Sequence, residues 1–263
     1  MRIALISDIH GNLIAFDIVL ADIESAQVDQ IICLGDVAAD GPQPREVIAR
    51  LQAIGRPVVL GNTDADLLQP LALVKADDES RRFQDIERWA ADQLTAADLA
   101  YVRSFQPTIE LSLAPALADN NEPPPSLLPQ GSPGSKGDMT SLLCFHGSPR
   151  SNTEVIEATT SESELAAILA GQHATILAGG HTHTQLVRRY RDMLIINPGS
   201  VGLPFEQAET ARNPAWAEYA ILTADNGTLG IELRRVPVDV AAIRRAILAS
   251  GMPHAEWLAK DWR

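Results

Sequence analysis

Five short polar clusters each follow an apolar run of the sequence, and their side chains are of types that bind metal ions. The clusters occupy residues 8–12, 35–36, 61–64, 146–148 and 180–183. They contain four of the six histidines, together with aspartate and asparagine, and each has a glycine. Ligand sites in α/β sheets form where the carboxyl ends of several strands meet. We therefore expect one crevice to collect all five clusters.

The donor types in these clusters indicate which ions they would bind. A mixed set of nitrogen and oxygen ligands without thiolate suits borderline transition metals better than calcium, and a carboxylate can bridge two cations. Taken singly, each residue has a plainer explanation, with Asp8 or Asp36 as a helix N-cap and His146 as a core histidine. The placement of all of them after apolar runs favours a two-metal centre instead.

The order of these motifs is also familiar. The pattern D-x-H, G-D, G-N-x-D, H-G and G-H-x-H resembles the calcineurin-like metallophosphoesterase superfamily, and within it the small bacterial phosphodiesterases. The resemblance covers most of the chain except residues 114–138. It implies an α/β fold in which residues 1–263 form a single domain. The implied architecture is a four-layer α/β/β/α sandwich of two mixed sheets with flanking helices.

The resemblance further implies roles for seven residues. One metal ion would be held by Asp8, His10 and His183, a second by Asn62, His146 and His181, and Asp36 would bridge both. The residues implied to be catalytic as well are Asp36, Asn62, His146 and His181. The implied cofactors are two divalent transition-metal ions per chain, with Mn first and Fe, Zn, Co or Ni as alternatives. The implied reaction is direct hydrolysis of a phosphate ester by hydroxide that bridges the metals.

Thr63 departs from the pattern, because many members of the superfamily have histidine there as the general acid. Threonine cannot donate a proton near pH 7, and general acid catalysis is typically worth about 100-fold to 10,000-fold. We therefore expect a phosphodiesterase that acts on small phosphodiesters or nucleotide anhydrides with good leaving groups. Asp64 is expected only as a helix cap or a partner of the ligand loops. The same departure motivates an alternative, a metal-retaining scaffold or nucleotide-sensing module with little turnover.

Residues near the ligand motifs are candidates for substrate contacts. Asn12 and Arg150 could bind the phosphate, but Asn12 could equally cap the following helix and Arg150 could be a solvated loop residue. Residues 197–200 (Asn-Pro-Gly-Ser) are predicted to form a turn that supports the metal loops. The remaining histidines, His173 and His254, are predicted to be structural.

Apolar periodicity predicts the elements that position these clusters. In the first part we expect strands at 3–7, 30–34 and 58–60 and helices at 13–26 and 45–53. Residues 65–105 have helical spacing and are predicted to form a small helical cap, and alternation predicts a strand at 109–113. Residues 114–138, rich in Pro, Gly, Ser and Asn, are predicted to be a mobile insertion. Beyond them we expect helices at 162–170 and, as the last one, 238–249, with strands at 142–145, 175–177, 185–189, 194–196, 218–222 and 229–235.

Composition limits the partners. The chain has 263 residues, of which 46% are hydrophobic, and a formal net charge of -13. Such a charge disfavours long nucleic acids, whose binding depends on Lys and Arg contacts to phosphate. No segment approaches the roughly 18 apolar residues of a membrane span, so we expect no membrane and a cytoplasmic protein. Cys33 and Cys144 are predicted to be buried reduced thiols. The expected partner is a small phosphate-ester substrate, and a homo-oligomer is left open.

Overall fold

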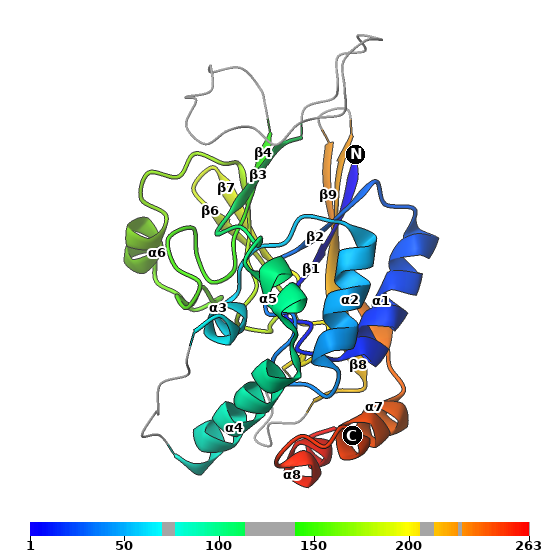
Figure 1. Ribbon diagram of the computed structural model, residues 1–263. Helices are drawn as coiled ribbons and strands as arrows, with labels where there is room; N and C mark the ends of the chain where they lie inside the picture. The colour runs from blue at the N-terminus through cyan, green and yellow to red at the C-terminus, as the bar shows by residue number, and fades with distance from the viewer. Residues whose placement is uncertain (70–76, 114–139, 206–212, 226–227, 263) are drawn as a thin grey trace.

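Two mixed β-sheets lie face to face in the computed structural model, which describes residues 1–69, 77–113, 140–205, 213–225 and 228–262 (Figure 1). The first sheet has the order β2-β1-β8-β9. Its strands are β1 (Arg2–Ile6), β2 (Gln30–Cys33), β8 (Trp216–Asp225) and β9 (Thr228–Pro237). β1 and β2 are parallel, whereas β8 is antiparallel to both β1 and β9. The carboxyl ends of β1 and β2 therefore lie at the same edge.

The second sheet has the order β3-β4-β5-β7-β6. Its strands are β3 (Ile109–Ser112), β4 (Ser141–Cys144), β5 (Ile176–Ala178), β6 (Leu186–Tyr190) and β7 (Met193–Asn197). The three central strands, β4, β5 and β7, are parallel, and the two edge strands are antiparallel to their neighbours. Parallel neighbours again bring the ends of β4 and β5 to one edge.

Helices cover the outer face of each sheet. They are α1 (Leu13–Ala26) and α2 (Pro44–Ile54) on the first sheet and α6 (Glu162–Ile168) on the second. In β1, Ile3 and Leu5 pack in the cluster between the sheets, while Ala4 and Ile6 pack in the cluster beneath α1 and α2. Burial on both faces explains why the strand is a continuous apolar run. The predicted four-layer α/β/β/α sandwich is confirmed.

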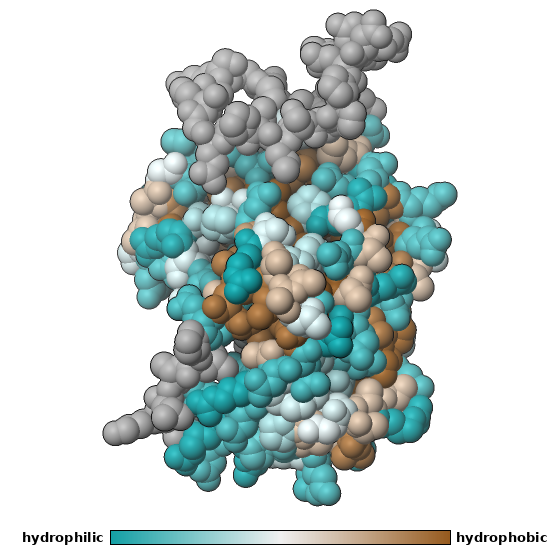
Figure 2. All heavy atoms as spheres, viewed as in Figure 1, coloured by the Kyte–Doolittle hydropathy of each residue, from teal (hydrophilic) through white to brown (hydrophobic). Residues whose placement is uncertain are grey.

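The segment predicted as a helical cap contains three helices, α3 (Asn62–Leu67), α4 (Asp78–Gln93) and α5 (Ala96–Val102). Thr95 and Asp98 form the expected capping box, each side chain accepting a hydrogen bond from the other's backbone N–H. α4 buries Ile86 and Ala90, and Figure 2 shows hydrophilic residues along its outward side. Residues 70–76 lie outside the described part of the chain, and the role of the segment as a cap stays a prediction.

The strand expected at 58–60 is not formed. Val58 makes a single bridge to Cys33, and Val59 makes one to Gln106 on another segment. A ladder needs successive residues to pair with the same neighbour, and here Gly61 already leads into α3. The insertion expected at 114–138 lies outside the described residues.

Two predictions from composition can be compared with the structure. Cys33 and Cys144 are free and buried, as predicted, and burial raises the pKa of both thiols. Among the described residues, no helix combines the length and apolar character needed to cross a membrane.

The chain continues past the helix expected to be last. α7 (Val240–Ala249) is followed by α8 (Ala255–Lys260), and both lie beside α4 at one end of the molecule (Figure 1). Six residues are too few to show helical periodicity, and His254 at the N-cap has a left-handed backbone. Leu258 and Trp262 are almost completely buried in a cluster with Ile86 of α4 and Ile247 of α7. α8 therefore belongs to the packed structure.

Trp262→Ala should destabilise the protein by about 3–5 kcal/mol, because the side chain is only 1% exposed and its removal leaves a cavity between α4, α7 and α8. Urea unfolding measures the change. Leu248→Ala on α7, at a side chain 54% exposed, is the matched control and should change stability by no more than about 0.5 kcal/mol. Equal effects of the two substitutions would show that α8 is not anchored as described.

Candidate metal centre

Loops from both sheets carry the predicted ligands. Asp8 follows β1, Asp36 follows β2, His146 follows β4 and His181 follows β5. A left-handed backbone is adopted by Asp8 (φ 55°), His10 (46°), Asp36 (55°), His181 (69°) and His183 (55°). Such values are uncommon outside glycine and persist where the surrounding structure fixes them, as at functional sites. The strained loops turn these side chains toward two compact groups.

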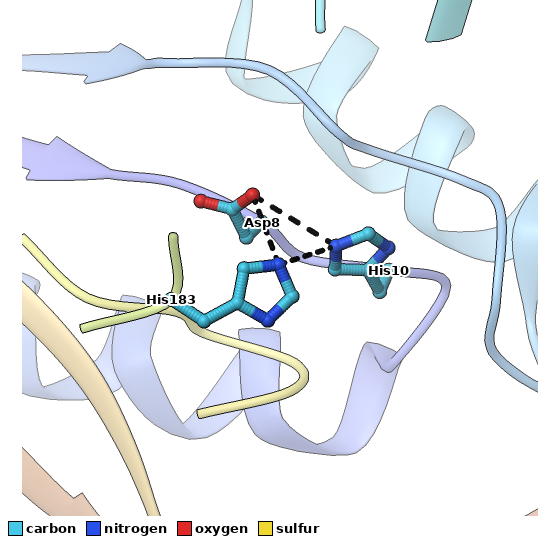
Figure 3. Close-up of side chains that lie close together, drawn as sticks. All are labelled: Asp8, His10 and His183. Atoms are coloured by element: carbon cyan, nitrogen blue, oxygen red, sulfur yellow. Dashed lines mark hydrogen bonds and ion pairs between the residues drawn. The ribbon is translucent and has the colours of Figure 1, made fainter. Parts of the chain in front are cut away.

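The first group consists of Asp8, His10 and His183 (Figure 3). The Nε2 atoms of the two histidines are 3.1 Å apart, and Nε2 of His183 is 3.2 Å from Oδ1 of Asp8. Each Nδ1 faces a carbonyl oxygen, of Ala39 for His10 and of Leu203 for His183, and must donate to it. In the neutral imidazoles both Nε2 atoms are then acceptors. Asp8 Oδ1 is also an acceptor and has no hydrogen-bond partner among the described residues.

The second group consists of Asp36, His146 and His181, with Asn62 beside it. Nδ1 of His146 donates to the carbonyl of Leu34 at 2.7 Å, which leaves Nε2 as an acceptor. That Nε2 lies 3.0 Å from Oδ1 of Asn62 and 3.2 Å from Oδ2 of Asp36. Acceptors that converge at such distances need a proton or a cation between them. The second group therefore has the same character as the first.

Asp36 lies between the two groups. Its Oδ1 accepts a hydrogen bond from the backbone N–H of Thr63, whereas Oδ2 is 3.2 Å from Nε2 of His146 and 3.8 Å from Nε2 of His10. One oxygen is thus fixed by the backbone of α3 and the other faces ring nitrogens from both groups. This geometry suits a bridging ligand.

Charge provides the test of whether these residues fit metal ions. Burial opposes ionisation of Asp8 and Asp36, but the imidazoles around them hold the pKa of both carboxyls below the usual range. Burial likewise opposes a charged imidazole, yet Asp36 raises the pKa of His146 to about 10 and Asp40 with Asp36 raises that of His10 to about 9. Protons on the histidines thus supply the positive charge that the buried carboxylates require. Divalent cations would supply the same charge, so the residues fit a metal centre.

Comparison with known proteins agrees with this geometry. The model of the calcineurin-like phosphoesterase superfamily domain matches residues 1–227. The chain belongs to this superfamily. It is 26% identical over 264 residues to an uncharacterized protein of Methanocaldococcus jannaschii, a match that covers 98% of this chain and 96% of the relative. Membership supports hydrolase activity.

Two solved structures are similar over nearly the whole chain. A metallophosphoesterase from Sphaerobacter thermophilus is 26% identical, with a TM-score of 0.70 and coverage of 99% of this chain and 97% of the other. A hypothetical protein from Pyrococcus horikoshii has a TM-score of 0.73 at 18% identity, with coverage of 98% and 96%, which supports the fold alone. Both similarities reach beyond the matched family domain, which ends at residue 227.

Glycines allow the ligand loops of this phosphoesterase to approach one another. A Cβ atom at Gly61 would lie 2.0 Å from Oδ1 of Asp36, and one at Gly180 would lie 1.9 Å from Oγ of Ser7 and 2.7 Å from Oδ2 of Asp8. All three distances are shorter than the contacts that Cβ atoms make in proteins. Each glycine directly precedes a predicted ligand, so the motif glycines are required by packing at the centre.

Asp64 ties the loop of Asp36 to the start of α3. Its carboxylate accepts hydrogen bonds from the backbone N–H groups of Asp36, Val37 and Gly61, at 2.8, 2.9 and 3.1 Å. Burial and the charge of Asp36 raise the pKa of Asp64 to about 6. The predicted role as a cap and partner of the ligand loops is confirmed. Thr63 is buried beside it, and its hydroxyl has no hydrogen-bond partner among the described residues.

The two predicted substrate-binding residues are both engaged elsewhere. Asn12 is 3% exposed, and its side chain accepts from the N–H of Ala15 and donates to the carbonyl of Gly202. The capping alternative is therefore confirmed for Asn12, and a phosphate contact by its amide stays a prediction. Arg150 pairs with Glu154 and donates to the carbonyl of Ala167, beside α6 rather than at the metal centre. A phosphate contact by Arg150 stays a prediction.

The turn at 197–200 supports the ligand loops as predicted. Asn197 donates from Nδ2 to the carbonyl of Gly180, and the hydroxyl of Ser200 donates to the carbonyl of Asp8. Each bond joins this turn to a loop that carries ligands. The two other histidines lie away from the centre, with His173 exposed and His254 paired with Asp85 on α4.

A hollow of about 610 Å³ opens over the centre. One side is formed by predicted metal ligands, and the other includes Phe83 and Glu87 of α4 and Trp257 of α8. Sequence reasoning missed these three, because they belong to helices without a motif. It also missed Asp40, which lies 3.3 Å from Nδ1 of His10. The signal that could have identified Asp40 is its position next to a glycine, shortly after the G-D motif.

Asp36→Asn should reduce bound metal from two ions per chain to one or none, because the amide lacks the negative charge that both groups share. Elemental analysis of protein desalted after loading with Mn measures the content. His173→Ala, at an exposed site, is the control and should retain the wild-type content. Two tightly bound ions in Asp36→Asn would contradict a bridging role.

Glu87→Gln should raise the melting temperature of the metal-free protein more at pH 8 than at pH 5. Burial, with the charges of Asp40 and Asp66, raises the pKa of Glu87 to about 8, whereas an unfolded glutamate ionises near 4.3. Between these values the unfolded chain loses the proton first, so the native state loses stability as pH rises. Thermal melts in chelator measure the effect. Glu256→Gln at an exposed site on α8 is the control, and a shift in Glu87→Gln that is equal at both pH values would contradict the assignment.

Proposed function

We propose that this protein is a metal-dependent phosphodiesterase that hydrolyses small phosphodiesters with good leaving groups. The observation that supports the proposal is the pair of ligand groups beside a hollow large enough for a small ligand. In each group, imidazole nitrogens and carboxylate oxygens lie close together. Two divalent ions held there would act as Lewis acids on the phosphate oxygens and lower the pKa of water. The seven predicted ligands are the residues that would hold them.

The chain's own contribution is to fix those ligands before substrate arrives. The carbonyls of Ala39, Leu203 and Leu34 each hold one imidazole through Nδ1 and so direct its Nε2 inward. Such outer partners typically set ligand orientation and metal affinity. Asp64 holds the loops of Asp36 and Asn62 together through three backbone N–H groups. The fold thus fixes the orientation of the side chains that would bind the metal ions.

Thr63 favours substrates whose leaving oxygen needs no proton. Its hydroxyl is buried and is too weak an acid to protonate an alkoxide near pH 7. Aryl phosphodiesters and nucleotide anhydrides have leaving groups that depart as stable anions. Unactivated alkyl esters would lose the most rate.

The charge of the hollow favours a diester over a monoester. Asp40, Glu79 and Asp261 line it in addition to the ligand residues. A monoester carries up to two negative charges near neutral pH, whereas a diester carries one. Carboxylates at short range therefore disfavour the monoester dianion.

Several further properties remain proposals. We propose Mn as the first metal to test, because a nitrogen and oxygen ligand set accepts it together with Fe, Zn, Co and Ni. Long nucleic acids are disfavoured as substrates by the net charge of -13. A cytoplasmic location and a homo-oligomer stay predictions from the sequence.

Metal-stripped protein with Mn added back should hydrolyse bis-p-nitrophenyl phosphate at least about tenfold faster, in kcat/KM, than p-nitrophenyl phosphate. The reason is the single negative charge of the diester, since both substrates release the same aryloxide leaving group. Release of p-nitrophenol measures both rates. Asp36→Asn should lose the activity, and His173→Ala should keep it.

Two outcomes would contradict the proposal. Faster cleavage of the monoester would contradict the preference for diesters. No turnover despite two bound ions per chain would favour the scaffold or nucleotide-sensing alternative.

A further inference from the structure

The wall of the hollow that faces the ligand groups is made by α4 and α8. Phe83 and Glu87 come from α4, and Trp257 and Leu258 come from α8. The superfamily domain matches only residues 1–227, so the α8 part of the wall lies beyond it. The α4 part of the wall lies within the matched domain, and the α8 part follows it.

Packing fixes the aromatic rings of this wall. The rings of Phe83 and Trp257 are edge to face, with centroids 5.2 Å apart and an interplanar angle of 80°. The guanidinium of Arg82 lies over the indole of Trp257, 5.3 Å from its centroid. His254 at the start of α8 bonds Asp85 of α4 at 2.9 Å. The two aromatic side chains are half-buried and held in place, so a ligand would meet a preformed surface.

The polar groups of the wall are acidic. Glu79 and Asp261 line the hollow, and none of its described lining residues is Lys or Arg. Carboxylates accept hydrogen bonds from N–H donors and repel phosphate groups. A ligand that extends from the metal end along this wall is favoured if it carries a flat ring with N–H donors and no second phosphate.

We propose that the α4–α8 wall recognises a nucleobase, so that the substrate is a nucleoside phosphodiester with a single phosphate, whose second ester oxygen belongs to the good leaving group, rather than a polyphosphate. The inference rests on the proposed function and names the substrate class of the same site. Trp257 and Phe83 offer the base an apolar aromatic surface, and the carboxylates accept hydrogen bonds from its exocyclic amine. The one phosphate would remain at the ligand groups, where bound metal ions would supply positive charge. Nucleotide anhydrides with several phosphates are disfavoured.

Calorimetric binding to Mn-loaded protein tests this recognition without turnover. Adenosine 5′-monophosphate and ribose 5-phosphate carry the same phosphate and differ by the base. The wild type should bind the nucleotide about tenfold more tightly, the order of magnitude of one aromatic stacking contact. Adenosine 5′-diphosphate should bind no more tightly than the monophosphate.

Variants of Trp257 separate stacking from folding. Trp257→Ala should bring the two affinities close to equality, and Trp257→Phe should restore most of the difference because it keeps an aromatic ring. Leu248→Ala, at an exposed position of α7, is the matched control and should keep the full ratio. All variants should retain the wild-type Mn content, since Trp257 is not a predicted ligand.

Equal binding of the two phosphates by the wild type, or an unchanged ratio in Trp257→Ala, would overturn the inference. Tighter binding of the diphosphate would overturn the preference for a single phosphate. Failure of the hydrolysis assay with the base preference intact would count against the proposed turnover and in favour of nucleobase recognition.

Discussion

Two buried carboxylates set the main physical constraint on this molecule. Asp8 and Asp36 are at most 2% exposed, and an isolated buried carboxylate is far too costly to persist without compensating charge. Imidazoles surround them and carry protons when no metal is present. Cations at this point therefore stabilise the native state and would also perform chemistry. Metal binding and folding are linked through the same two side chains.

The two-sheet architecture is what makes this concentration of ligands possible. β1 and β2 deliver Asp8, His10 and Asp36 from one sheet, and β4 and β5 deliver histidines from the other. Several bonds cross between the sheets at the centre, including that from His146 to the carbonyl of Leu34 and that from Ser200 to the carbonyl of Asp8. The left-handed residues are tolerated because these bonds and the apolar cluster between the sheets fix the loops around them.

The sequence predicted the features that depend on local chemistry. Apolar runs followed by ligand motifs predicted most of the strands. The order of the motifs predicted the fold and the same seven ligand residues that lie together in the structure. The predictions went wrong where tertiary contacts decide. Residues 58–60 are apolar enough for a strand, but their partners lie on two different segments. The sequence also left open whether Asn12 caps a helix, and the bond from the N–H of Ala15 shows that it does.

The wall formed by α4 and α8 could not be predicted from the sequence, for a different reason. Trp257 and Phe83 have no spacing relation to the ligand motifs, and they meet only because α7 and α8 pack back onto α4. A wall of this origin can change without disturbing any metal ligand, since none of its aromatic residues bonds to the ligand loops. In this chain the predicted metal ligands lie at strand ends, whereas the proposed recognition of the substrate is assigned to helices. A motif search identifies the ligand residues at the strand ends but not the residues of the helical wall.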